Sequence, residues 1–123
     1  FAKLDNGRRI FFFFIEDTKP EEFSFIGDTY WFQYGGVNPA EYIEKIAGRM
    51  KVCHFKDYKF KDDKPAFAEI GTGNLNLDVI YNSCKNSGVR YIVIEQDLCE
   101  IDPRESMAIS YKNLVEIAKR NEK

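Results

Sequence analysis

The sequence is most constrained by an alternation of short apolar runs with capped amphipathic stretches. Apolar runs rich in β-branched and aromatic residues occupy residues 23–30, 50–55 and 90–95. Their length and composition predict strands buried on both faces, as in parallel sheets. Because helical patterns follow them, we expect β–α units around a parallel sheet, and so an α/β fold.

The predicted helices carry their own start signals. Asn38, Pro39 and Glu41 read as an N-cap, a first-turn proline and an acid at the third position, and Asp102 with Pro103 repeats this signature. A third helix is expected after Asn76, where apolar residues recur at positions 77, 80, 81 and 84.

Two other segments give weaker signals. The apolar run 10–15 is too short for periodicity to choose between helix and strand. Its four consecutive phenylalanines would be an aggregation hazard on an edge strand, so we expect a short helix that buries most of them against the sheet. Residues 56–64, with the sequence KDYKFKDDK, are expected to form a solvated loop.

Composition excludes several classes of function. The net charge is −2, and no clustered basic stretch would neutralise a nucleic-acid backbone. The longest apolar run is far shorter than the ~20 residues that cross a bilayer, so no membrane partner is expected. Cys53, Cys84 and Cys99 are odd in number and widely spaced. They do not suggest a disulfide framework, and we expect a cytoplasmic protein.

Three polar residues end the predicted strands on equivalent faces. Because side chains alternate across a strand, Asp28 lies on the same face as Ile26, and His54 lies on the same face as Val52. Glu95 likewise shares a face with the residue two positions before it. If the opposite faces meet the helices, Asp28, His54 and Glu95 converge at the carboxyl ends of the strands, where α/β folds bind ligands.

One imidazole and two carboxylates form a ligand set suited to Mn²⁺, Mg²⁺, Co²⁺ or Zn²⁺. A fourth ligand is missing from this set. The alternatives are a structural, hydrogen-bonded His54 and an Asp28 that braces a turn with Thr29.

Further residues are candidates for binding substrate. Tyr30 and Trp31 follow Asp28, where an aromatic ring could stack on a sugar; core packing is the alternative. Lys56 shares the parity of His54 and could contact a substrate oxygen, unless it is a solvated loop lysine. Glu69 opens the glycine-containing segment 69–74, which could approach a phosphate or sugar oxygen or form an ordinary turn.

The motifs DTYW (28–31), HFKD (54–57) and IEQD (94–97), in this order, resemble the sugar phosphate isomerase/epimerase family of xylose-isomerase-like TIM barrels. The resemblance implies a (β/α)₈ barrel. The chain would supply helix 5 and the strand–helix units 6, 7 and 8, so that residues 1–123 form a partial barrel domain without its N-terminal half. A TIM barrel takes ~250 residues, and Phe1 would then be a cut end.

The resemblance also implies the chemistry. It assigns Asp28, His54 and Glu95 as ligands of a divalent metal, with a fourth ligand, a glutamate, just before Phe1. The implied activity is isomerisation or epimerisation of a sugar or sugar phosphate by proton transfer, with Glu95 as both ligand and acid/base catalyst. Where related epimerases hold substrate with a histidine, this sequence has Tyr30 and Trp31.

Two alternatives to this activity remain open. One is a lyase similar to the inosose dehydratases, and the other is a catalytically inactive sugar-binding or assembly domain. The isolated chain is expected to turn over little substrate and to self-associate, because a partial barrel leaves sheet edges and inward faces open.

Overall fold

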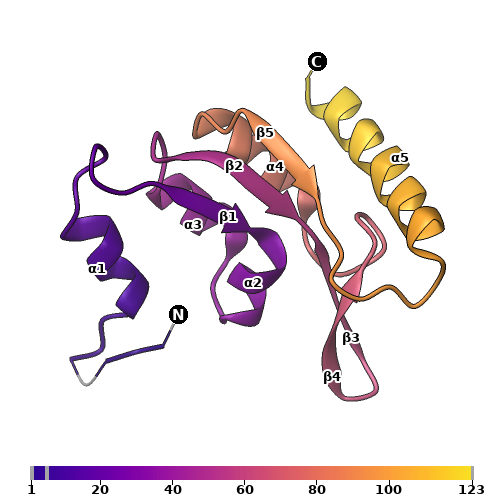
Figure 1. Cartoon of the computed structure of the whole chain (residues 1–123), viewed down its shortest axis with the longest axis horizontal. Helices are drawn as coiled ribbons and strands as arrows, with labels where there is room; N and C mark the ends of the chain where they lie inside the picture. The colour runs from indigo at the N-terminus through magenta and orange to yellow at the C-terminus, as the bar shows by residue number, and fades with distance from the viewer. Residues whose placement is uncertain (1, 5, 123) are drawn as a thin grey trace.

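The computed structural model describes residues 2–4 and 6–122 (Figure 1); Phe1 lies outside them. The elements, in chain order, are α1 (Ile10–Glu16), β1 (Phe25–Asp28), α2 (Thr29–Tyr34), α3 (Pro39–Lys45), β2 (Met50–Phe55), β3 (Asp57–Lys61), β4 (Lys64–Ala68), α4 (Leu77–Asn86), β5 (Tyr91–Ile94) and α5 (Pro103–Asn121). Among the described residues, no helix has the length and apolar character needed to cross a membrane.

The sheet is parallel and has the order β1-β2-β5, which confirms the expected β–α units. Helices α2 and α3 connect β1 to β2, and α4 lies on the connection to β5. In the register, Asp28 pairs with His54, and His54 pairs with Val93. The backbone N–H of Glu95 donates to the Phe55 carbonyl at 3.2 Å, so the pairing continues just beyond β5.

One face of this sheet forms the core. Phe25, Cys53 and Phe55 point toward α3 and α4 and are buried, as the alternation predicted. Figure 1 shows α3 and α4 together on this side of the sheet. On the opposite face, Ile26 and Tyr91 remain exposed.

The expected helix caps are present. The Asn38 side chain accepts a hydrogen bond from the backbone of Ala40 at 3.0 Å, and Asn76 caps α4 in the same way. Asp102 accepts from the backbone N–H of Arg104 at 2.8 Å and begins α5. Since each cap satisfies a backbone donor at a helix start, these boundaries could be predicted from sequence.

Helix α1 confirms the helix prediction for the phenylalanine run, but none of its residues is fully buried. The Phe11 ring packs on Phe25 with centroids 5.2 Å apart, and Phe12 packs on Tyr42 at 5.8 Å. By contrast, Phe14 remains exposed. Consecutive residues of a helix point in different directions, so one contact surface cannot bury four phenylalanines in a row.

The prediction of a solvated loop over 56–64 was wrong. Strands β3 and β4 form an antiparallel hairpin there, drawn below the main sheet in Figure 1. Its turn contains Asp62 and Asp63, which adopt left-handed conformations with φ of 51° and 58°. Two such residues give the turn type that matches the twist of a hairpin. The first strand is also shorter than predicted, because Thr29 and Tyr30 already belong to α2.

Candidate metal centre

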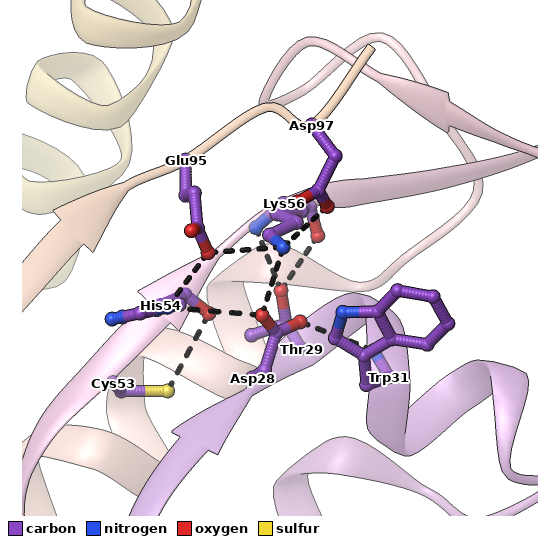
Figure 2. Close-up of polar contacts among 8 residues, drawn as sticks. All are labelled: Asp28, Thr29, Trp31, Cys53, His54, Lys56, Glu95 and Asp97. Carbon is purple, nitrogen blue, oxygen red and sulfur yellow. Dashed lines mark hydrogen bonds and ion pairs between the residues drawn. The ribbon is translucent and has the colours of Figure 1, made fainter.

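Three different strands position the three predicted metal ligands. Asp28 ends β1 and caps α2, with its Oδ1 accepting from the backbone N–H of Trp31 at 3.1 Å. This leaves Oδ2 directed toward His54 of β2. Glu95 comes directly after β5, and its side chain reaches the same point (Figure 2).

The candidate donor atoms lie close together. His54 Nδ1 is 2.7 Å from Glu95 Oε2 and 3.9 Å from Asp28 Oδ2. One donor atom from each of the three residues can be chosen so that all lie within 4.8 Å of one another. The structure thus brings together the set that strand parity selected.

The chemistry of this set fits a divalent cation. Ligand bonds of about 2.0–2.2 Å place two donors of one ion roughly 3–4 Å apart. The 3.9 Å between His54 Nδ1 and Asp28 Oδ2 falls in this range, whereas the 2.7 Å between His54 Nδ1 and Glu95 Oε2 is that of a direct hydrogen bond, which a bound ion would have to replace. The three side chains are partly exposed, so a bound ion would keep positions open for further ligands. Binding of Mn²⁺, Mg²⁺, Co²⁺ or Zn²⁺ by these residues stays a prediction.

Lys56 lies at the centre of the site. Its side chain is only 2% exposed, which overturns the solvated-loop alternative. The Nζ atom is 2.6 Å from Asp97 Oδ2, 2.9 Å from Glu95 Oε2 and 3.2 Å from Asp28 Oδ2. A single ammonium therefore bridges three carboxylates (Figure 2).

This arrangement shifts two pKa values. Burial lowers the pKa of Lys56, but the hydrogen bonds to Asp97 and Glu95 and the charge of Asp28 outweigh it, so the pKa lies above its usual range. The hydrogen bond from Lys56 lowers the pKa of Glu95, burial opposes this, and the charge of Lys56 and the proximity of His54 lower it further. Both groups are thus held in their charged forms near neutral pH.

Thr29 fixes the backbone of Lys56. Its Oγ1 accepts a hydrogen bond from the Lys56 N–H at 2.9 Å and donates one to the Lys56 carbonyl at 2.6 Å. Thr29 is fully buried. The end of β1 and the end of β2 are thereby joined beneath the site.

Asp57 organises the segment before α4. Its fully buried carboxylate accepts from the backbone N–H groups of Gly71 at 3.0 Å, Gly73 at 2.9 Å and Leu75 at 3.1 Å. Sequence reasoning missed this role because Asp57 was assigned to a loop. It also missed Asp97, which lies past the end of β5. The signal available for both was their place as the last letters of the HFKD and IEQD motifs.

The predicted substrate-binding residues differ in position. Tyr30 is buried, and its ring centroid lies 4.3 Å from that of Phe67 in the hairpin. Trp31 is 44% exposed beside Lys56, whose Nζ lies 5.8 Å from the indole centroid. Glu69 Oε1 accepts from Ser106 Oγ at 2.9 Å and so ties its segment to α5. Contact of these residues with a substrate stays a prediction.

Solved structures provide the comparison with known proteins. A sugar phosphate isomerase/epimerase from Parabacteroides distasonis ATCC 8503 matches with a TM-score of 0.71 and 27% identity, covering 89% of this chain and 37% of that one. The chain resembles the sugar phosphate isomerase/epimerases. This confirms the resemblance that the three motifs indicated.

Two further structures confirm the fold. A second sugar phosphate isomerase/epimerase from the same organism matches at 22% identity and TM-score 0.66, covering 95% of this chain and 38% of that one. A xylose isomerase domain protein from Planctomyces limnophilus matches at 21% identity and a TM-score of 0.74. This match covers 89% of this chain and 43% of that one. The chain has a partial TIM-barrel fold and spans about two fifths of these structures. No protein-family model and no curated protein matches it.

Proposed function

We propose that residues 1–123 are the C-terminal half of a xylose-isomerase-like barrel domain. The full-length protein would be a divalent-metal-dependent isomerase or epimerase of a sugar or sugar phosphate. The observation that carries the proposal is the convergence of Asp28, His54 and Glu95 at the ends of three parallel strands. The similarity to a sugar phosphate isomerase/epimerase over 89% of the chain supports it.

Asp28, His54 and Glu95 would hold the metal, and a glutamate from the preceding strand would complete the ligand set. When bound, the metal supplies Lewis-acid polarisation of the substrate carbonyl and its neighbouring hydroxyl. Glu95 accepts the proton from the carbon beside that carbonyl. The additional glutamate would act on the other side of that carbon.

Other residues around the centre would position the substrate. The Trp31 ring offers an exposed apolar face, and Tyr30 packs edge-on behind it with centroids 5.0 Å apart. Lys56 would bind a substrate oxygen through its ammonium, and Glu69 would order the loop at the rim. The free thiols of Cys53, Cys84 and Cys99 would suit a reducing cytoplasm.

Proton exchange tests this function. The full-length protein, loaded with Mn²⁺ or Co²⁺, is incubated in D₂O with a panel of ketoses and sugar phosphates. We expect metal-dependent deuterium incorporation at the carbon next to the carbonyl, and loss of it in Glu95→Gln. Glu100→Gln, a surface carboxylate paired with Lys59 and Lys61, is the matched control. Turnover without solvent deuterium would contradict the proton-transfer mechanism.

The same centre supports a lyase as a second candidate. Tyr30 and Trp31 stand where related epimerases carry a substrate-holding histidine, and Tyr30 is buried rather than directed to solvent. A substrate held differently could lose a hydroxyl from the neighbouring carbon. Product mass separates the two reactions, because dehydration removes one water and isomerisation removes nothing.

An inactive sugar-binding or assembly domain is the third candidate. Lys56 favours it, because its ammonium already pairs with Asp28 and Glu95. Such a protein would bind a sugar without stoichiometric metal. Metal analysis together with sugar binding by the full-length protein distinguishes this case.

A further inference from the structure

Lys56 contacts the same carboxylate oxygens that face the histidine. Its Nζ is 2.9 Å from Glu95 Oε2, the atom that lies 2.7 Å from His54 Nδ1. It is also 3.2 Å from Asp28 Oδ2, the oxygen of that carboxylate directed toward His54. Figure 2 shows the ammonium between the three carboxylates.

An ammonium and a divalent cation would therefore use the same two oxygens. Both are positive, and their repulsion is poorly screened where the lysine side chain is almost fully buried. A buried ammonium that loses its partners also bears a desolvation cost. Metal binding must then either displace Lys56 or be weakened by it.

Asp97 offers a position to which Lys56 can withdraw. Its Oδ2 makes the shortest of the three lysine contacts, at 2.6 Å, and Asp97 is not part of the metal-ligating group. Thr29 holds the backbone of Lys56 at both its N–H and its carbonyl. Any movement is thereby confined to the flexible four-carbon side chain.

We propose that Lys56 is an internal counter-cation that competes with the divalent metal for Asp28 and Glu95, and that Asp97 retains its ammonium when the metal enters. The inference rests on the proposed metal centre and adds what sets the affinity of that centre for the divalent metal. Lys56 lowers that affinity. Asp97 raises it by retaining the displaced ammonium.

The test is a double-mutant cycle read out by calorimetric titration of the metal-free full-length protein with Mn²⁺ alone. Lys56→Met should bind Mn²⁺ about tenfold more tightly than the wild type, and Asp97→Asn about fivefold more weakly. In the Lys56→Met background, Asp97→Asn should have almost no effect. Lys59→Met removes a positive charge from the adjacent hairpin and should leave the affinity unchanged.

The outcomes separate this inference from the proposed function. Equal Mn²⁺ affinity in wild type and Lys56→Met would overturn the competition and leave the metal centre standing. An equal effect of Asp97→Asn on Mn²⁺ affinity in both backgrounds would overturn the proposal that Asp97 retains the displaced ammonium. Asp97 would then act only as a negative charge. Absence of Mn²⁺ binding in wild type and Lys56→Met alike would overturn the metal centre itself, and the inference with it.

Circular dichroism would reveal whether Lys56→Met folds. If it does not fold, a second comparison tests the proposal. Asp97→Asn and Asp97→Glu both keep Lys56 in place. The proposal expects weaker Mn²⁺ binding in Asp97→Asn and affinity near that of the wild type in Asp97→Glu. Equal affinity in wild type and both variants would overturn it.

Discussion

The carboxylate of Asp57 and the backbone N–H of Gly73 form a 2.9 Å hydrogen bond that joins the start of β3 to the segment before α4. The same buried carboxylate accepts two further backbone donors from this segment. Hydrogen bonds to a charged group contribute about 1.5–3 kcal/mol each, and buried donors without acceptors are costly. Asp57 therefore anchors the segment before α4 to the start of β3.

We predict that Asp57→Asn destabilises the protein by about 3 kcal/mol or more, because one amide oxygen cannot replace two carboxylate oxygens and the NH₂ group would face other donors. Urea unfolding measures the loss. Asp63→Asn, an exposed change in the hairpin turn at a left-handed position that asparagine tolerates, should stay within about 0.5 kcal/mol. Similar losses in both variants would contradict the anchoring role of Asp57.

Gly73 is also required for its small size. A Cβ at this position would lie 2.5 Å from the Tyr58 carbonyl oxygen and 2.6 Å from Asp57 Oδ1. Both atoms are fixed by hydrogen bonds, so we predict that Gly73→Ala costs about 2–3 kcal/mol in urea unfolding. Gly27→Ala is the comparison, because its Cβ would meet the Met50 thioether, which can rotate away at a cost of about 1 kcal/mol. Equal costs would show that the rigid neighbours of Gly73 do not matter.

Strand alternation was enough to select Asp28, His54 and Glu95 from the sequence. Each ends a run whose opposite face is apolar, and a two-residue period places the three side chains on one face of a parallel sheet. The capped helices were predicted for a similarly local reason, since an N-cap side chain bonds to a backbone only two or three residues away.

The remaining features depend on contacts that no local pattern encodes. The hairpin was missed because KDYKFKDDK is polar, and its turn uses two aspartates in place of asparagine and glycine. Lys56 meets Asp97 across 41 positions in sequence, and Asp57 meets Gly73 across 16. Burial of Lys56 becomes visible only when β1, β2 and the segment after β5 are placed together.

The attachment of α5 to α4 should depend on pH. Arg120 Nη2 lies 2.6 Å from Asp78 Oδ2, and this hydrogen bond lowers the pKa of Asp78 from its usual range; burial opposes the shift and Asn121 adds to it. A carboxyl with a lowered folded pKa contributes stability above its unfolded pKa and loses that contribution as pH falls through the folded pKa.

Asp78→Asn should accordingly lower the melting temperature slightly at neutral pH, because the pair is partly exposed. The difference from wild type should begin to shrink below about pH 4, near the unfolded pKa, and vanish once the pH has fallen below the folded pKa of Asp78. A constant difference between wild type and Asp78→Asn at all pH values would show that the charge of Asp78 is not responsible.

The exposed sheet face should drive self-association of the isolated chain. Ile26 and Tyr91 are both paired in register with Val52, so they form one row across the sheet, and they are 68% and 65% exposed. Exposed apolar sheet surface of this kind is removed from water by pairing with another chain.

We predict that the 123-residue chain sediments as oligomers and that Ile26→Lys with Tyr91→Lys shifts it toward the monomer. Tyr111→Lys, an equally exposed tyrosine on α5 at 64%, should leave sedimentation unchanged. A wild-type monomer at high concentration, or an equal response to Tyr111→Lys, would count against this face as the contact surface.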